Sequence, residues 1–172
     1  MEKRMNALKF ALENEMRERE FYLDSAKKTK NMAGKNMFLQ IADEEKEHYE
    51  ILKKLHDKWE KQKAWPATVP LKVRKSAAHL VLKSMAGKKS ARIAGNDSEL
   101  KAVRTAIDFE ARAAALYTKL EKASSDPKEK LFFSMLAGIE RDHLLSLRDT
   151  EEFLTDPVFW YQNAEKTSLD GA

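Results

Sequence analysis

Residues 44–48, Glu-Glu-Lys-Glu-His, and residues 140–143, Glu-Arg-Asp-His, decide how this chain folds. Each stretch places a Glu and a His one helical turn apart, in the middle of an apolar stripe with helical spacing. The first stripe consists of Phe38, Ile41, Leu52 and Leu55, and the second of Phe133, Leu136 and Leu147. Both Glu and both His residues are therefore expected to point into the core of a helical protein.

The two stretches belong to one internal repeat. A shift of the sequence by 95 positions aligns them without a gap. The same shift aligns a Glu and a Tyr upstream of each stretch. The aligned pairs are Glu15/Glu110, Tyr22/Tyr117, Glu45/Glu140 and His48/His143. Self-similarity of this kind predicts two related structural units, here two helical hairpins.

Helix boundaries follow from capping residues and turn signals. We predict helices over about residues 2–29, 32–63, 96–123 and 127–153, with the first turn near Ala33-Gly34. Asn96 to Glu99 is a capping sequence. Asp126 is suited to cap the fourth helix, with Pro127 at its first position. Asp156-Pro157 is expected to end the fourth helix.

The domain organisation predicted from these helices is a single domain over residues 1–172. Hairpin 1 covers about 2–63, a crossover about 64–95, hairpin 2 about 96–153, and a C-terminal tail 154–172. One long crossover lets the third helix run parallel to the second. We therefore expect an all-α, ferritin-like four-helix bundle. A short helix within 77–85 is expected to pack on it, and the aromatic tail is expected to dock on its surface or on a second subunit.

Composition excludes several functional classes. The 32 basic and 28 acidic residues are interleaved, which is typical of a solvated helical surface and not of a nucleic-acid-binding patch. The absence of cysteine excludes disulfides, thiolate metal sites and iron–sulfur clusters. Neither a signal peptide nor a stretch of membrane-spanning length is found, so we expect a cytoplasmic protein.

Six inward-facing residues predict a metal centre. Glu15 and Glu110 lie on the apolar faces of helices one and three, level with the two Glu-x-x-His pairs. Four buried carboxylates would repel one another and lose their hydration, so a cation is expected among them. Oxygen and imidazole donors suit iron or manganese, and also zinc. The predicted ligands are Glu15, Glu45, His48, Glu110, Glu140 and His143. The alternative is a set of core polar residues that hold no metal.

Tyr22 and Tyr117 lie two turns after Glu15 and Glu110 on the same helix faces. They are either ordinary core tyrosines with a hydrogen-bonded hydroxyl, or they hold a ligand carboxylate or relay an electron.

Three stretches carry a resemblance to a known family. They are Ala11-Leu12-Glu13-Asn14-Glu15 with the following Phe21-Tyr22, Glu44 to His48, and Glu140 to His143. The chain resembles the rubrerythrin-like branch of the ferritin-like superfamily. That resemblance implies two iron ions, with Glu45 and His48 serving one and Glu140 and His143 the other. Glu15 and Glu110 would complete the set, and some glutamates would bridge.

The resemblance also implies a reaction. Members of the branch reduce hydrogen peroxide or O2 at a non-haem di-iron centre. Because the chain has no cysteine, it lacks a rubredoxin-like domain. An external donor, rubredoxin-like or a flavoprotein, is then needed, and a homodimer is expected. The alternative function is an iron-binding, ferroxidase or iron-storage protein without peroxidase turnover.

One departure from the family concerns the reaction. Peroxidase members typically carry an extra Glu one turn after the ligand of the third helix, where this chain has Ala113. The repeat-equivalent position on the first helix is Glu18. This carboxylate either acts on the metals from the other side, or, as its position next to Arg17 favours, is solvent-exposed or paired with a basic residue.

Overall fold

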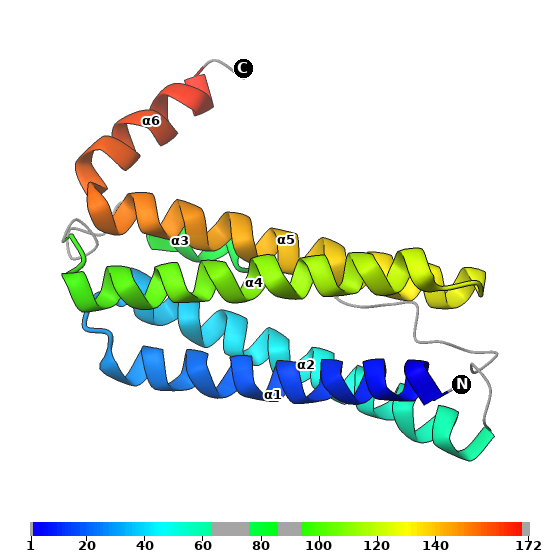
Figure 1. The fold of residues 1–172 in the computed structure, drawn as a ribbon. Helices are drawn as coiled ribbons and strands as arrows, with labels where there is room; N and C mark the ends of the chain where they lie inside the picture. Colours follow the sequence, from blue (N-terminus) through cyan, green and yellow to red (C-terminus); the bar gives the residue numbers. More distant parts are fainter. Residues whose placement is uncertain (1, 63–75, 86–93, 170–172) are drawn as a thin grey trace.

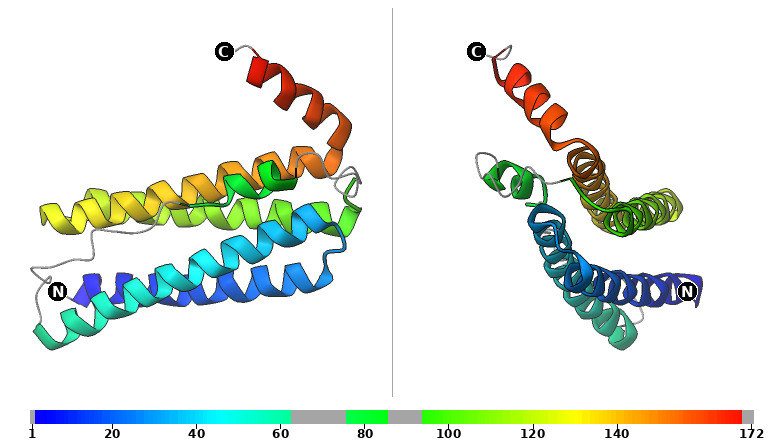
Figure 2. Two further views of the ribbon diagram at one scale, coloured as in Figure 1. Left: turned by 180° about the vertical axis from the view of Figure 1, so that it is seen from behind. Right: turned by 90° about the vertical axis from the view of Figure 1, so that its left-hand side faces the viewer.

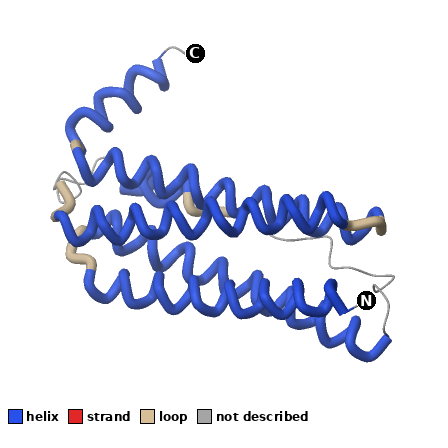
Figure 3. The backbone as a smooth tube through the Cα atoms, in the orientation of Figure 1, coloured by secondary structure: helices blue, strands red, loops and turns tan. Residues whose placement is uncertain are grey.

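The computed structural model describes residues 2–62, 76–85 and 94–169. These residues form helices, and no strand occurs among them (Figure 3). The helices are α1 (Glu2–Lys28), α2 (Met32–Gln62), α3 (His79–Met85), α4 (Asp97–Ala123), α5 (Pro127–Thr155) and α6 (Pro157–Leu169). The predicted all-α, ferritin-like bundle is confirmed.

Four long helices form the bundle as two antiparallel hairpins. Helices α1 and α2 make one hairpin, α4 and α5 the other, and the two lie against each other (Figures 1 and 2). Helix α4 faces α1, and α5 faces α2. Helices α2 and α4 run in the same direction, as a single crossover requires. No helix in the described part of the chain is long and apolar enough to span a membrane.

Capping side chains fix where the helices begin. Asn31 accepts hydrogen bonds from the backbone of Ala33 and Gly34 at the start of α2. Asn96 and Glu99 form a complete capping box on α4. Asp126 caps α5 with Pro127 in its first turn. The predicted starts of α4 and α5 are thereby confirmed. The turn between the two helices of each hairpin brings residues at the same height of the bundle opposite one another.

Glu99 also joins the two hairpins at one end of the bundle. Its Oε1 accepts hydrogen bonds from the backbone N–H of Lys30, at 2.6 Å, and of Asn31, at 2.9 Å. At the same end, the N–H of Gly95 donates to the carbonyl of Leu154 at 2.7 Å. Burial raises the pKa of the Glu99 carboxyl, but hydrogen bonds from Asn31, Asn96 and Lys30 outweigh it, so the net pKa is lowered. The two hydrogen bonds from Lys30 and Asn31 to Glu99 hold one hairpin against the other, and the bond from Gly95 to Leu154 ties the start of the second hairpin to α5.

The apolar core is divided into two clusters. One lies toward the α1–α2 turn, and the other toward the α4–α5 turn. The first includes Tyr22, Phe38, Ile41, Val103, Leu147 and Phe153. The second includes Leu8, Leu52, Leu55, Tyr117, Phe133 and Leu136. Between them, at mid-height of the bundle, the core-facing positions are occupied by buried Glu and His residues.

The described part of the connector packs on the outer side of α2 and α5. Helix α3 contacts both of them (Figure 2), and Leu82 is buried in the first core cluster. The short helix expected within residues 77–85 is therefore present. The rest of the predicted crossover, residues 64–75 and 86–93, lies outside the described residues.

Within the predicted C-terminal tail, residues 154–172, the structure has a further helix, α6 (Pro157–Leu169), which the sequence analysis did not predict. Asp156-Pro157 ends α5, as expected, but it also starts a new helix, with the side chain of Asp156 accepting from the backbone of Phe159 at 3.0 Å. This is the same Asp-Pro signal that starts α5. Helix α6 projects from the bundle end (Figure 2). The ring of Trp160 packs against Phe153 of α5, so part of the aromatic segment covers the chain's own core.

Candidate metal centre

Six ligand-type side chains meet between the two core clusters. Each of the four bundle helices contributes one Glu, and α2 and α5 each add a His one turn later. All six are 2% exposed or less. The structure thus brings together every predicted ligand: Glu15, Glu45, His48, Glu110, Glu140 and His143.

These side chains form two groups of four that share two members. One group is Glu15, Glu45, His48 and Glu140; the other is Glu45, Glu110, Glu140 and His143. Within each group, one ligand atom from every residue lies within 4.8 Å of all the others. Each group has three carboxylates and one imidazole. Glu45 and Glu140 belong to both groups, so either carboxylate could serve two metal positions.

The distances around each imidazole show this sharing. His48 Nδ1 lies 3.2 Å from Glu15 Oε2 and 3.0 Å from Glu45 Oε2. His143 Nδ1 lies 3.1 Å from Glu45 Oε1 and 3.3 Å from Glu140 Oε2. The two oxygens of Glu45 therefore face different histidines. The two imidazole rings stack with centroids 5.7 Å apart, so both sets of ligands occupy one compact volume.

Unpartnered polar atoms test whether these residues fit a metal pair. Among the described residues, several fully buried ligand atoms have no hydrogen-bond partner. They are Glu15 Oε2, Glu45 Oε1, Glu110 Oε2, both oxygens of Glu140, and His143 Nδ1. Buried polar atoms normally have partners, and leaving one without costs about 1–3 kcal/mol. All of these atoms face the same space. Oxygen and imidazole donors in this number fit two first-row metal ions.

The electrostatics of the cluster favour retained protons when no metal is bound. Burial, followed by the negative charge of Glu45, raises the pKa of Glu15 to about 8. Burial and Glu45 also raise the pKa of Glu140. Burial alone would lower the pKa of both histidines, but the surrounding glutamates raise it well above its usual value. Protons held in this way are exchangeable for metal cations.

Two tyrosines tie the cluster across the bundle. Tyr22 on α1 donates a hydrogen bond to Glu110 on α4, and Tyr117 on α4 donates one to Glu15 on α1. Both tyrosines are fully buried. Each tyrosine hydroxyl is therefore hydrogen-bonded, and the group that accepts this bond is a predicted ligand carboxylate. Both the interpretation as a hydrogen-bonded core tyrosine and the interpretation as a residue that holds a ligand carboxylate apply. These contacts fix the carboxylates that the two groups do not share.

Glu44 is a residue that the sequence analysis did not single out. Its Oε2 lies 2.7 Å from Nε2 of His143, on the side of the ring away from the cluster. Burial opposes ionisation, but His143 and the backbone of Ala77 lower the pKa of Glu44 to about 2. The sequence indicated Glu44 through its position next to Glu45. Adjacent residues of a helix point in different directions, so a carboxylate beside an inward-facing ligand can contact a different helix.

The expected exposure of Glu18 was wrong. Its side chain is only 3% exposed, and its Oε2 has no hydrogen-bond partner among the described residues. Arg17, the expected ion-pair partner, instead donates to Asn14 at 2.6 Å. Burial, together with the charges of the cluster carboxylates, raises the pKa of Glu18 to about 11. Helix α1 turns this residue inward because it lies one turn after Glu15 on the same face.

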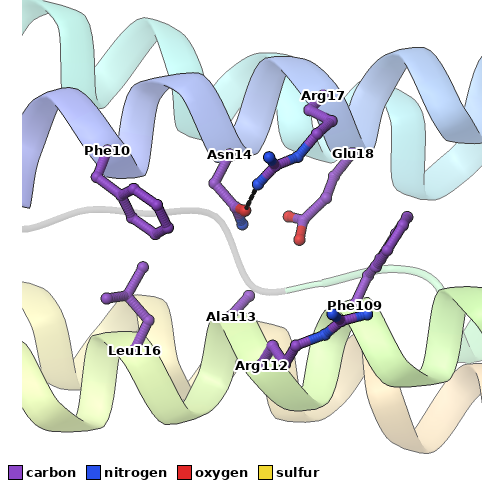
Figure 4. Close-up of a pocket in the computed structure, with 8 residues that line it drawn as sticks. All are labelled: Phe10, Asn14, Arg17, Glu18, Phe109, Arg112, Ala113 and Leu116. Carbon is purple, nitrogen blue, oxygen red and sulfur yellow. Dashed lines mark hydrogen bonds between the residues drawn. The ribbon is translucent and has the colours of Figure 1, made fainter.

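A cavity of about 460 Å³ lies beside Glu18, between α1 and α4. Phe10, Asn14 and Arg17 line it from α1, and Phe109, Arg112, Ala113 and Leu116 from α4. Figure 4 shows Glu18 directed from α1 toward α4. The small side chain of Ala113 leaves this space open. The cavity thus reaches from the bundle surface to a carboxylate next to the ligand cluster.

Comparison of the chain with known protein families gives a match. The family model described as Rubrerythrin matches residues 6–151, which include all six candidate ligands. No curated protein and no solved structure matches the chain significantly.

Proposed function

This chain belongs to the rubrerythrin family, and we propose that it is a non-haem di-iron oxidoreductase that reduces hydrogen peroxide or O2. The observation that carries the proposal is the pair of ligand groups sharing Glu45 and Glu140. Two shared carboxylates would hold two cations close together, and two adjacent metals suit a two-electron reaction at an O–O bond. Family membership supports iron, while manganese and zinc accept the same donors.

Two iron ions in this site would supply one electron each to the oxidant. The chain's own residues do the positioning. Glu15 with His48 would complete one metal position, and Glu110 with His143 the other. Tyr22 and Tyr117 keep Glu110 and Glu15 oriented toward the centre through their hydrogen bonds. The apolar clusters on both sides limit the access of water to the ligands.

The cavity between α1 and α4 is the proposed approach for a small oxidant. Its inner wall is Glu18, and the exposed side chains of Arg17 and Arg112 line it closer to the surface. In the metal-free protein, burial and the charges of the neighbouring carboxylates raise the pKa of Glu18 to about 11, so this carboxyl holds a proton at neutral pH before metal is bound. We propose that Glu18 takes the part played by the extra carboxylate of peroxidase members, from α1 instead of from position 113.

Electrons must then come from outside the described metal centre. The chain has no cysteine with which to build an iron–sulfur or rubredoxin-type donor of its own. We propose an external donor, rubredoxin-like or a flavoprotein, and a cytoplasmic homodimer as the functional form.

Anaerobic loading with ferrous iron followed by a peroxide titration tests the proposal. We expect two irons to be oxidised for each peroxide consumed, and a reductant to restore the starting spectrum. A protein that instead oxidises ferrous iron with O2 and accumulates a large excess of iron would be an iron-storage protein, the alternative function.

A matched pair of variants tests the site itself. Glu45→Ala combined with Glu140→Ala should abolish loading with two irons. Asp43→Ala combined with Asp142→Ala, which removes two exposed carboxylates from the same helices, should load as the wild type does. Equal loading of both variants would refute the assignment of the ligands.

A further inference from the structure

The two nitrogens of the His143 ring have different surroundings. Nδ1 faces the ligand cluster, 3.1 Å from Glu45 Oε1. Nε2, on the opposite side of the ring, lies 2.7 Å from Glu44 Oε2. A metal at Nδ1 leaves the proton on Nε2, where it is donated to the Glu44 carboxylate. A carboxylate in this position fixes the ring and makes the imidazole a stronger electron donor to the metal.

Glu44 is itself held in place by two further hydrogen bonds. Its Oε1 accepts from the backbone N–H of Ala77, at 2.9 Å, and from Nε2 of Gln40, at 2.7 Å. Ala77 lies just before α3, in the connector between the hairpins. The carboxylate is half-buried. Both of its oxygens are thus engaged, and the connector is linked to the metal centre through one side chain.

The repeat does not reproduce this contact on the other side. Addition of 95 to position 44 gives position 139, which is Ile139 in α5. Ile139 is buried and has no hydrogen-bond acceptor in its side chain. The repeat-equivalent imidazole, His48, therefore receives no carboxylate from that position. The six candidate ligands are symmetric under the repeat, whereas the residues behind them are not.

We propose that Glu44 is a positioning residue that makes the two metal positions unequal. Glu44 strengthens metal binding at the position formed with His143 and Glu110. The position formed with His48 and Glu15 receives no carboxylate from the repeat-equivalent residue. This inference rests on the proposed two-metal centre. Its consequence is ordered loading, in which the first metal ion enters the position of His143.

Anaerobic titration with cobalt(II) tests the proposal, because cobalt(II) reports its ligands by visible absorption. Glu44→Gln keeps the size of the side chain and a carbonyl oxygen for the N–H of Ala77, but it removes the charge. We expect one of the two binding events to weaken by about 10–100-fold, as is usual for the loss of such a supporting carboxylate. Asp43→Asn, one residue away and exposed, should match the wild type.

Two backgrounds assign the effect to one metal position. In His48→Ala the position of His143 remains, and there Glu44→Gln should weaken cobalt binding by about 10–100-fold and shift its absorption. In His143→Ala the same change should alter neither affinity nor spectrum. Equal effects in both backgrounds, or none in either, would overturn the proposal.

A third outcome separates this inference from the proposed function. Failure of the wild type to bind two ions would refute the metal centre, whereas two ions bound unchanged in Glu44→Gln would refute only the role of Glu44. Circular dichroism of the metal-free variants checks their fold. If Glu44→Gln loses helix content, a second variant is needed. Glu44→Asp keeps the charge, so its affinity for cobalt(II) should lie closer to that of the wild type than the affinity of Glu44→Gln does. Equal weakening in both variants would also overturn the proposal.

Discussion

Tyr22 of the first hairpin donates its phenolic hydrogen bond to Glu110 of the second. The repeat generates the reciprocal contact, from Tyr117 of the second hairpin to Glu15 of the first. Each hairpin thus contributes three candidate ligands to the centre and a tyrosine that orients one ligand of the other hairpin. The centre is consequently a property of the assembled bundle, because neither hairpin alone provides both the carboxylate and its donor.

Removal of either hydroxyl should destabilise the metal-free protein. In Tyr22→Phe, Glu110 keeps its burial but loses its donor, and Tyr117→Phe does the same to Glu15. A buried acceptor left unpaired costs about 1–3 kcal/mol. Urea denaturation should show this loss in the free energy of unfolding for each variant. Tyr49→Phe, on a partly exposed face of α2, is the control, and a loss of the same size there would contradict the explanation.

The shared carboxylates should matter to both metal ions, and the unshared ones to a single ion. Glu45→Ala removes a ligand from both groups, whereas Glu15→Ala removes one only from the group of His48. A calorimetric titration should find both binding events weakened in the first variant and one in the second. The weakening should exceed the roughly 10–100-fold typical of residues that merely support a ligand. Identical two-step weakening in Glu15→Ala would argue against the sharing.

Metal loading should release protons. The raised pKa of Glu15, about 8, and the raised pKa values of His48 and His143 mean that these groups hold protons at pH 7 in the metal-free protein. A metal ion needs their deprotonated forms. Apparent affinity should therefore rise between pH 6 and pH 8, by about tenfold per pH unit for each proton released. A pH indicator in weak buffer measures the release directly, and loading without acidification would refute the prediction.

The ionised carboxylate of Glu99 should stabilise the protein when the pH is above the group's ordinary pKa of 4.5, and this stabilisation should decline at lower pH. Its pKa is lowered on folding, so the native state favours the ionised form. The stabilisation is present above the unfolded pKa and is lost as the pH falls through the lower, native value. Glu99→Gln should cost about 1–3 kcal/mol at pH 7. The difference from wild type should shrink as the pH falls below 4.5. Glu121→Gln, which removes a carboxylate from the other end of α4, is the matched control variant.

Most of the bundle was predictable because its signals are local or repeated. Capping residues such as Asn96 and Asp126 act on the backbone of their own helix, so their effect can be read along the chain. The candidate ligands interrupt apolar stripes twice at the same spacing, which fixes their inward direction without three-dimensional information.

The residues that the sequence did not predict depend on contacts between distant segments. Glu44 and His143 are 99 positions apart, and the contact of Glu44 with Ala77 spans the connector. The burial of Glu18 depends on the packing of α4 against α1, since residues of both helices line the cavity beside it. Helix α6 is different: its Asp-Pro start signal was present, but the same dipeptide also ends α5.

An exchange of Glu18 and Ala113 should separate metal binding from reaction with peroxide. These positions are equivalent under the repeat, and both line the cavity between α1 and α4. Glu18→Ala removes a carboxylate that belongs to neither ligand group, so two irons should still bind. If Glu18 takes part in the reaction, peroxide-driven oxidation should slow by about 10²–10⁴-fold, the range for a positioned acid–base group.

The double variant Glu18→Ala with Ala113→Glu returns a carboxylate to the cavity from the opposite helix, where about 460 Å³ of space accommodates it. It should recover a large part of the lost rate in stopped-flow measurements, because the metal ligands are arranged symmetrically under the repeat. Glu13→Ala, an exposed change on α1, is the control. An unaltered rate in Glu18→Ala would show that the buried carboxylate serves only the fold. A slow rate in both Glu18 variants would show that the carboxylate must come from α1 and not from α4.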